Sequence, residues 1–184
     1  MLPLVNTTDE RRRNLILIGF MGTGKTTIGK QVAKSLGFRF VDTDQLISQK
    51  AGKSIPDIFE DEGEETFREL ETDVLQGCAA AENQVIATGG GIVTKTTNHA
   101  ILKQVGYVIW LQASPETIYD RVRRNRNRPL LQTEDPEKTI RDLMEQRVGL
   151  YEAAQDMAVT TDGLTLDETA YGITESARVA LGLE

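Results

Sequence analysis

Short apolar runs alternate with longer stretches of helical periodicity along the chain. Five of these runs are typical of buried strands: Leu15–Ile18, Arg39–Val41, Gln84–Ala87, Tyr107–Leu111 and Met157–Val159. Because the segments between them are long enough for crossover helices, the pattern predicts parallel strands. We therefore expect an α/β fold with three layers, α/β/α, around a five-stranded parallel sheet.

The same signal marks the start of two helices. Ser114 and Asp135 are each followed by proline and glutamate, which predicts capped helices running toward Arg124 and Tyr151. The segment 125–134 between these helices is polar and basic and contains a proline, so we expect a mobile loop there.

The first strand leads into a glycine-rich loop. Residues Gly19–Thr26 match the pattern G-x-x-x-x-G-K-[ST], and an apolar helical stripe that ends before Gly37 follows. Glycines let several backbone N–H groups converge on phosphate oxygens at the positive end of a helix. Lys25 adds a charge for the β- and γ-phosphates, and the Thr26 hydroxyl is the expected Mg²⁺ ligand. The order of strand, loop and helix favours a phosphate-binding loop over a chance match.

Composition and charge narrow the class of protein. The 184 residues are 39% hydrophobic and 27% charged, which is ordinary for one globular domain, and the net charge is −7. This acidic balance argues against nucleic-acid binding, and no apolar run has the length of a membrane span. We expect a cytoplasmic protein in which a tail over residues 1–13 precedes a single domain over residues 14–184.

The single cysteine and the single histidine receive no chemical role. Cys78 shares a helical stripe with Phe67 and Val74, which predicts a small core residue, and one cysteine cannot form an intrachain disulfide. His99 stands in a polar stretch that could start a helix, so a surface position is favoured over a catalytic one.

Two carboxylates follow the second strand. Asp42 and Asp44 stand at i, i+2 at its carboxyl end, the edge where open α/β sheets bind ligands. One could hold Mg²⁺ through water, while the other accepts a hydrogen bond, or the proton, from a substrate hydroxyl. The alternative is that Asp44 only caps a helix beginning at Gln45.

An arginine and a glutamate are paired by helical spacing. A helix over Glu64–Glu82 places Arg68 and Glu71 at i, i+3 on one face. A paired guanidinium is held in place and can still donate to a ligand carboxylate. Spacing alone favours the simpler alternative, a solvated pair on the helix surface.

Glycines and arginines mark two further candidate ligand contacts. Gly89, Gly90 and Gly91 directly follow the third strand and can offer N–H groups to a small molecule, although a flexible turn is the alternative. Five arginines within residues 121–128 indicate a lid that closes on phosphates, or else a solvated basic helix end. Arg128 is the best placed of the five, and Arg147 is a second candidate for an anionic substrate.

Taken together, these segments resemble one family. The matching stretches are G-F-M-G-T-G-K-T-T, F-V-D-T-D, F-R-E-L-E, A-T-G-G-G-I-V, R-P-L-L and the R-x-x-L-Y that ends at Tyr151. Their residues and order, over about residues 14–161, resemble shikimate kinase in the nucleoside-monophosphate-kinase branch of P-loop proteins. The resemblance implies the strand order 2-3-1-4-5, a substrate-binding region at about 44–72 and a lid at about 124–135.

The resemblance also implies roles for individual residues. Catalysis is assigned to Lys25, Asp44 and Arg128, and Mg²⁺ binding to Thr26 directly and to Asp42 through water. The expected ATP-binding residues are Gly22, Thr23, Gly24, Lys25, Thr26, Thr27, Arg121 and Arg128, where Arg124 is the alternative to Arg121 for stacking on adenine. The expected shikimate-binding residues are Asp44, Phe59, Phe67, Arg68, Gly89, Gly90, Gly91 and Arg147.

The function implied by the resemblance is transfer of the γ-phosphoryl group of MgATP to the 3-hydroxyl of shikimate by a monomer. Its partners would be the small molecules ATP and shikimate, with neither nucleic acid nor membrane. Another small-metabolite kinase of the branch, acting for example on gluconate, is the first alternative. A non-catalytic relative that only binds a nucleotide or a partner is the second, and four intact residues count against it: Lys25, Thr26, Asp44 and Arg128.

Overall fold

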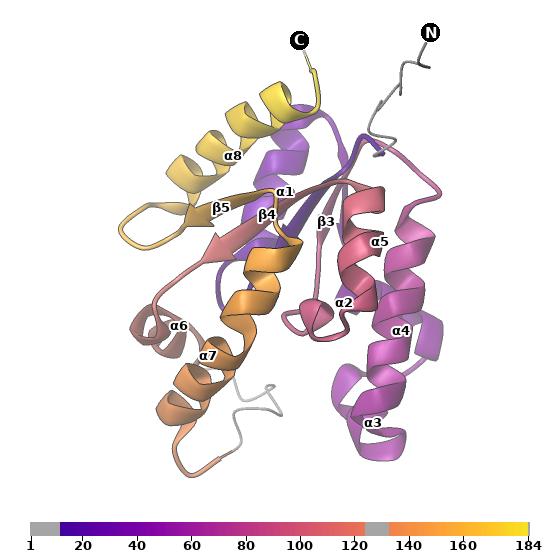
Figure 1. Cartoon of the computed structure of the whole chain (residues 1–184), viewed down its shortest axis with the longest axis vertical. Helices are drawn as coiled ribbons and strands as arrows, with labels where there is room; N and C mark the ends of the chain where they lie inside the picture. The colour runs from indigo at the N-terminus through magenta and orange to yellow at the C-terminus, as the bar shows by residue number, and fades with distance from the viewer. Residues whose placement is uncertain (1–11, 124–132, 184) are drawn as a thin grey trace, which may run out of the picture.

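The computed structural model describes residues 12–123 and 133–183 and is built around one parallel sheet (Figure 1). The strand order is β2-β3-β1-β4-β5, and all four pairings are parallel, which confirms the predicted order. The strands span β1 (Leu15–Ile18), β2 (Arg39–Asp42), β3 (Gln84–Ala87), β4 (Tyr107–Gln112) and β5 (Met157–Thr160). Every predicted strand is therefore present, and three of them run one residue beyond the apolar run.

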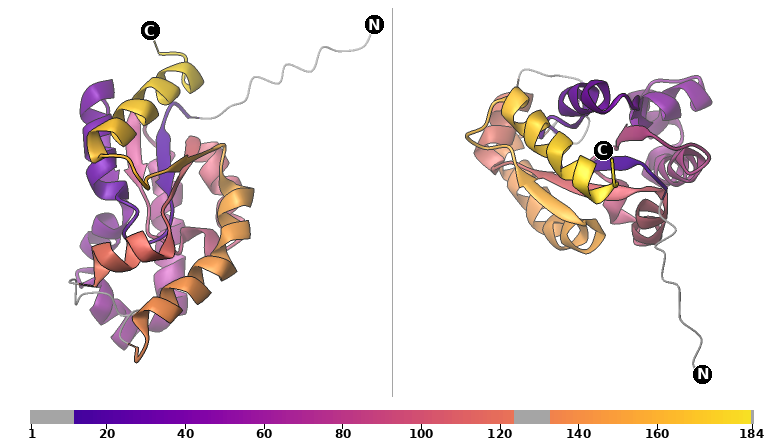
Figure 2. Two further views of the ribbon diagram at one scale, coloured as in Figure 1. Left: turned by 90° about the vertical axis from the view of Figure 1, so that its left-hand side faces the viewer. Right: turned by 90° about the horizontal axis from the view of Figure 1, so that it is seen from above.

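Helices cover both faces of the sheet. They span α1 (Lys25–Leu36), α2 (Thr43–Ala51), α3 (Ile55–Asp61), α4 (Gly63–Cys78), α5 (Thr97–Val105), α6 (Pro115–Val122), α7 (Pro136–Ala154) and α8 (Leu166–Ala180), with a 3₁₀ turn η1 (Ile92–Thr94). Figure 2 shows α1 and α8 on one side of the sheet and α7 on the other. The predicted three-layer α/β/α architecture is confirmed.

Alternating strand residues build two cores. Leu15 and Leu17 of β1 point toward α1 and α8, whereas Ile16 and Ile18 point toward α4, α5 and α7. All four residues are fully buried, as expected for a central strand of a parallel sheet covered on both faces. Cys78 lies in the second of these cores, which confirms its predicted place.

Predicted capping residues set the ends of several helices. Ser114 and Asp135 accept hydrogen bonds from backbone N–H groups at the starts of α6 and α7, and each helix has proline in its first turn. Gly37 ends α1 in the left-handed conformation, with φ 69°. These three expectations are confirmed. His99 is half-buried rather than fully exposed, and its Nε2 lies 2.9 Å from the carbonyl oxygen of Val93.

The helix predicted over Glu64–Glu82 is α4, and it ends earlier than predicted, at Cys78. The side-chain amide of Gln84 donates to the carbonyl oxygens of Cys78 and Ala81, both at 2.9 Å. Asn83 takes a left-handed φ of 57°. These local bonds turn the chain into β3 and replace the last turn of the expected helix.

A helix near the carboxyl terminus had no counterpart among the sequence predictions. Thr165 and Glu168 form a reciprocal capping box at the start of α8. Ala170, Ile173 and Ala177 then pack against α1. Within the described part of the chain, no helix is long and apolar enough to cross a membrane.

Candidate active site

The glycine-rich loop joins β1 to α1 at the carboxyl edge of the sheet. Gly22 and Gly24 have φ values of 79° and 92°, in the left-handed region that favours glycine. A β-carbon on Gly22 would also lie 2.8 Å from Cγ1 of Val122 in α6. Gly24 takes the N-cap position of α1 with no capping side chain, so the positive end of the helix faces the loop. This arrangement is suited to binding phosphate.

Two side chains of the loop hold its own backbone. The Nζ atom of Lys25 donates to the carbonyl oxygens of Gly19 at 2.7 Å and Phe20 at 2.9 Å. The hydroxyl of Thr23 is buried and donates to Phe20 at 2.8 Å. Lys25 thus places a positive charge within the loop, and Thr23 contributes through the shape of the turn.

The carboxylate of Asp42 lies between α1 and α2. Its Oδ2 accepts a hydrogen bond from the Thr26 hydroxyl at 3.0 Å, and its Oδ1 accepts from the N–H groups of Asp44 and Gln45. Asp42 is therefore the cap of α2, which begins at Thr43, and the alternative that Asp44 caps this helix is wrong. A hydroxyl and a carboxylate oxygen side by side fit the hard oxygen ligands that Mg²⁺ prefers.

A cavity of 260 Å³ opens over the loop. It is lined by the predicted ATP-binding residues Gly22, Gly24, Lys25, Thr26 and Thr27, and also by Met21, Asp42, Asp44, Thr88 and Gly90. Asp44 and Gly90 belong to the predicted substrate-binding set. The structure therefore brings the phosphate-binding loop and part of the substrate-binding set to one cavity.

Side chains pack tightly against the three glycines that follow β3. A β-carbon on Gly89 would lie 2.5 Å from Oε1 of Glu71 and 2.8 Å from Oδ1 of Asp44, and one on Gly91 would overlap the guanidinium of Arg68. The N–H of Gly89 donates to the hydroxyl of Thr43 at 3.2 Å. Of the three predicted N–H donors, that of Gly89 is therefore paired within the protein, and those of Gly90 and Gly91 stay predicted ligand contacts.

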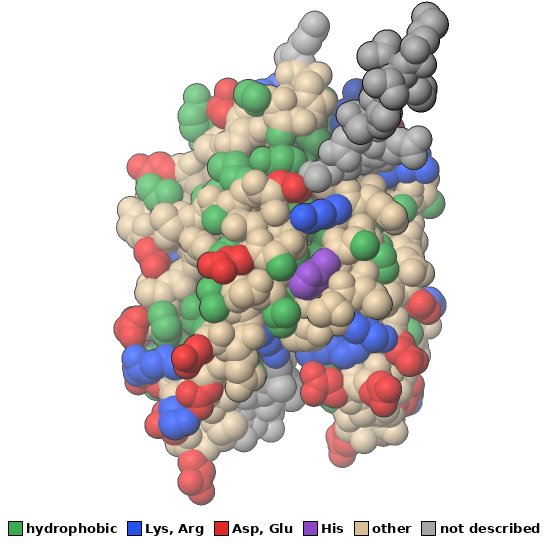
Figure 3. Space-filling view, in the orientation of Figure 1, with side chains coloured by type: hydrophobic (Ala, Val, Ile, Leu, Met, Phe, Trp, Pro, Cys, Tyr) green, Lys and Arg blue, Asp and Glu red, His purple; other side chains and the backbone are tan. Residues whose placement is uncertain are grey.

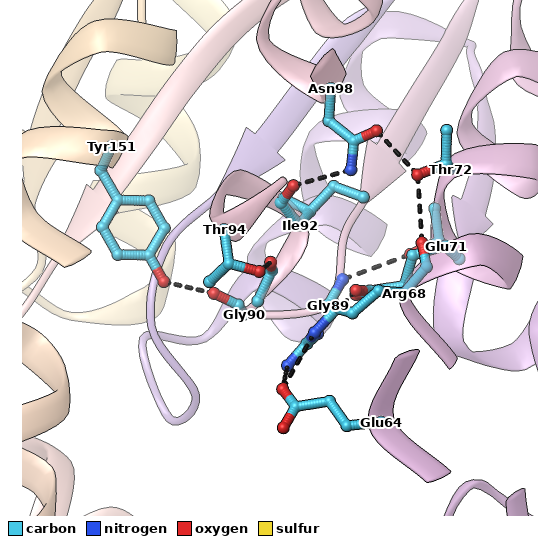
Figure 4. A network of polar contacts seen from close by, with 12 residues as sticks. Glu64, Arg68, Glu71, Thr72, Gly89, Gly90, Ile92, Thr94, Asn98 and Tyr151 are labelled. Carbon is cyan, nitrogen blue, oxygen red and sulfur yellow. Dashed lines mark hydrogen bonds and ion pairs between the residues drawn. The ribbon is translucent and has the colours of Figure 1, made fainter. Parts of the chain in front are cut away.

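Arg68 is held by carboxylates on two sides (Figure 4). Nη1 lies 2.6 Å from Oε2 of Glu71, and Nη2 lies 2.8 Å from Oε1 of Glu64. The side chains of Arg68 and Glu71 are 11% and 1% exposed, so the alternative of a solvated surface pair is wrong. Burial raises the pKa of the Glu71 carboxyl, and the charge of Arg68 opposes that shift.

Aromatic rings support both predicted carboxylate-binding arginines. The guanidinium carbon of Arg68 lies 5.3 Å from the centre of the Phe67 ring, which itself lies 4.7 Å from the ring of Phe59. Arg147 on α7 is buried, with its guanidinium carbon 5.7 Å from the Phe20 ring. The charge of Arg147 also lowers the pKa of the Glu71 carboxyl, as does that of Arg68. Both arginines therefore lie near this carboxylate.

The predicted lid is only partly described. Arg121 on α6 donates from Nη1 to the carbonyl oxygen of Gly22 at 3.1 Å and to the hydroxyl of Thr161 at 3.2 Å. It therefore links the phosphate-binding loop to the segment after β5. Arg128 and the adenine alternative Arg124 lie outside the described residues.

Two residues with no predicted role contact the glycine stretch. The hydroxyl of Thr43 accepts from Gly89, and the hydroxyl of Tyr151 donates to the carbonyl oxygen of Gly90 at 2.5 Å (Figure 4). Both stand in stretches that carried the family resemblance, F-V-D-T-D and R-x-x-L-Y. Tyr151 follows Arg147 by one helical turn, and this spacing was the available signal that it faces the same site.

The space-filling view shows a hollow on one face of the molecule. In Figure 3 the molecule is hollowed between the N-terminal end of α7 and the pair α3 and α4, and basic side chains gather at the edge of the hollow. Acidic side chains surround them on the same face. A local basic cluster of this kind can bind an anionic ligand in a protein whose net charge is −7.

The comparisons with known proteins agree on one family. The family model described as shikimate kinase matches residues 21–178. The shikimate kinase of Thermodesulfovibrio yellowstonii is 47% identical over 158 residues, which cover 86% of this chain and 91% of the relative. A structure of shikimate kinase from Acinetobacter baumannii in complex with shikimate has a TM-score of 0.86 and 41% identity, over 91% of this chain and 93% of that one.

A more distant structure shares the fold alone. A gluconokinase from Sinorhizobium meliloti has a TM-score of 0.57 with 16% identity, over 94% of this chain and 97% of that one. Its low identity carries no argument about substrate. The match over residues 21–178, together with a relative that is 47% identical over nearly its whole length, shows that the chain belongs to the shikimate kinase family.

Proposed function

We propose that the chain transfers the γ-phosphoryl group of ATP to the 3-hydroxyl of shikimate, giving shikimate 3-phosphate and ADP in the biosynthesis of chorismate and aromatic amino acids. Family membership supports this proposal. The observation that carries it is the placement of Arg68, held by Glu64 and Glu71 against Gly91, beside a glycine stretch that also lines the phosphate-binding cavity.

The acceptor would bind through charge and shape. Arg68 and Arg147 would pair with the shikimate carboxylate, and the N–H groups of Gly90 and Gly91 would add hydrogen bonds. Phe59 and Phe67 would line the pocket against the ring. Because Glu71 and Phe67 already fix Arg68, its guanidinium would need little reorganisation on binding. The surrounding region, about residues 44–72, would act as the substrate-binding part of a single domain.

Asp44 would act on the acceptor hydroxyl. It lies beside Gly89 and lines the cavity over the phosphate-binding loop, a position from which it would border both ligands. There it would orient the 3-hydroxyl and take its proton as the bond from this oxygen to the γ-phosphorus forms. The bond between the γ-phosphorus and the bridging oxygen of ADP breaks in the same displacement.

The nucleotide would bind on the loop side of the cavity. Backbone N–H groups from Gly22 to Thr27 would cradle the phosphates, and Lys25 would stabilise the charge that develops on the transferred group. Thr26 directly and Asp42 through water would hold Mg²⁺, which when bound neutralises charge on the β- and γ-phosphates. Arg121 would contact adenine, and Arg128 of the lid over about residues 124–135 would join Lys25 on the transferred phosphoryl group.

We also propose a cytoplasmic monomer. All proposed ligand contacts come from one chain, and the phosphoryl donor ATP is a cytoplasmic metabolite.

ADP release from MgATP by the purified protein tests the function. We expect strong stimulation by shikimate and none by gluconate, the acceptor of the first alternative. Stimulation by gluconate instead of shikimate would contradict the assigned acceptor, and binding of ATP without any release of ADP would favour the non-catalytic alternative.

A further inference from the structure

Tyr151 is a buried tyrosine of α7 that lies against the glycine stretch. It is 2% exposed, and its ring stacks on Trp110 of β4, with ring centres 5.4 Å apart and an angle of 17° between the planes. Its hydroxyl donates to the carbonyl oxygen of Gly90 at 2.5 Å. Burial raises the pKa of Tyr151 to about 12, although the charge and a side-chain hydrogen bond of Arg147 oppose this shift, so the hydroxyl keeps its proton and stays a donor at neutral pH.

Gly90 lies between this tyrosine and the phosphate-binding loop. A β-carbon on Gly90 would lie 3.2 Å from the backbone N of Met21 and 3.4 Å from the carbonyl oxygen of Gly19. The backbone of the glycine stretch thus packs on one side against the backbone of the phosphate-binding loop. Figure 4 shows Tyr151 reaching Gly90 from one side while Arg68 lies on the other.

The hydrogen bond from Tyr151 fixes one peptide plane. No peptide bond among the described residues is cis, so the carbonyl of Gly90 and the N–H of Gly91 point in opposite directions. With the carbonyl held toward Tyr151, the N–H of Gly91 points away from α7, and the guanidinium of Arg68 lies against Gly91. The N–H of Ile92 donates to the carbonyl oxygen of Gly89, and the N–H of Thr94 donates to that of Gly91, so the ends of this turn are held within the stretch. The Gly90–Gly91 peptide between them can still rotate, because glycines rotate more freely than other residues, and the bond from Tyr151 favours the observed orientation.

Resting on the proposed function, we propose that Tyr151 is a positioning residue for the acceptor. It holds the Gly90–Gly91 peptide so that the N–H of Gly91 donates to the shikimate carboxylate beside Arg68. Arg147 stands one turn earlier on α7. The same helix would therefore supply one arginine for the shikimate carboxylate and, through Tyr151, orient the N–H of Gly91 toward the same group.

The test is the Tyr151→Phe variant, which keeps the ring on Trp110 and removes only the hydroxyl. Tyr171→Phe is the matched control, because Tyr171 is 71% exposed on α8 and loses the same atom. KM for shikimate, KM for ATP, kcat and the melting temperature are measured for both variants and the wild type. Isothermal titration calorimetry with shikimate and no nucleotide gives the Kd for shikimate without turnover.

We expect Tyr151→Phe to raise KM and Kd for shikimate about three- to tenfold, the range of one hydrogen bond, with KM for ATP unchanged. The control should match the wild type. Unchanged shikimate Kd in Tyr151→Phe would overturn the inference, and so would an equal rise of both KM values together with a lower melting temperature. Failure of the proposed function is distinguishable, because it would appear in the wild type as ADP release that shikimate does not stimulate.

Discussion

Replacement of Gly91 by alanine should displace Arg68 without straining the backbone. The φ of Gly91 is −95° and its ψ is 1°, which alanine adopts readily. The added β-carbon would lie 2.5 Å from Cζ and 2.6 Å from Nη2 of Arg68, so the guanidinium has to move. Movement of that group breaks the 2.6 Å bond to Glu71, a carboxylate that is 1% exposed.

The size of the effect on activity follows from the charged hydrogen bond that Arg68 would make to the shikimate carboxylate and that its displacement removes. Such bonds contribute about 1.5–3 kcal/mol, which corresponds to a loss of about 10- to 150-fold in kcat/KM for shikimate. The buried Glu71 would also lack its cation, so the free energy of unfolding should fall by about 1–3 kcal/mol. KM for ATP should stay the same, because the new methyl group contacts Arg68 and not the phosphate-binding loop.

A coupled ADP assay with varied shikimate measures this loss, and Gly77→Ala is the control. Gly77 lies in the same helix as Arg68, and a β-carbon there would meet no atom within 4 Å. The control should keep full activity and gain about 0.5–1 kcal/mol of stability from the better helix former. A kcat/KM for shikimate within twofold of the wild type in Gly91→Ala would refute the reasoning.

Three further predictions concern the loop, a helix cap and a buried carboxylate. Lys25→Ala should lower kcat at least about 100-fold with the fold retained by circular dichroism, although its hydrogen bonds to Gly19 and Phe20 are lost, and normal turnover would remove Lys25 from catalysis. Asp135→Ala should lower the free energy of unfolding by about 1 kcal/mol through loss of the α7 cap, measured by urea denaturation, and an unchanged midpoint would contradict that capping role. The raised pKa of Glu71 means that the folded state binds its proton more tightly than the unfolded state. Its contribution to stability is therefore present below the ordinary pKa of 4.5 and is lost as the pH rises through the raised value. Urea denaturation across this range should show the Glu71→Gln variant gaining stability relative to the wild type as the pH rises, and parallel pH profiles would disprove the shift.

Much of the fold could be read from local patterns. Each strand coincides with an apolar run, because the central strands are covered on both faces and need continuous apolar residues. Helix starts at Ser114 and Asp135 were predictable since capping depends on a few adjacent residues. The capping box of Thr165 and Glu168 is an equally local signal for the start of α8.

The features that the sequence did not predict depend on how distant segments pack together. The spacing of Arg68 and Glu71 predicts a pair but not its environment, and the glycine stretch of another segment is what excludes water from it. Asp44 was the only cap that the sequence suggested for this helix, whereas Asp42 caps α2, because β2 ends at Asp42 and the helix begins at Thr43. The contact between Tyr151 and Gly90 joins residues 61 positions apart, which no local pattern encodes.

The close packing of Gly90 on the backbone of Gly19 and Met21 bears on how such kinases diversify. The backbone of the glycine stretch packs on the backbone of the phosphate-binding loop, whereas the two arginines that would bind the acceptor carboxylate are side chains of α4 and α7. Substitutions on those two helices can therefore change the acceptor without moving the phosphates. A library confined to α4 and α7 is the rational place to redesign this protein for a new hydroxy acid.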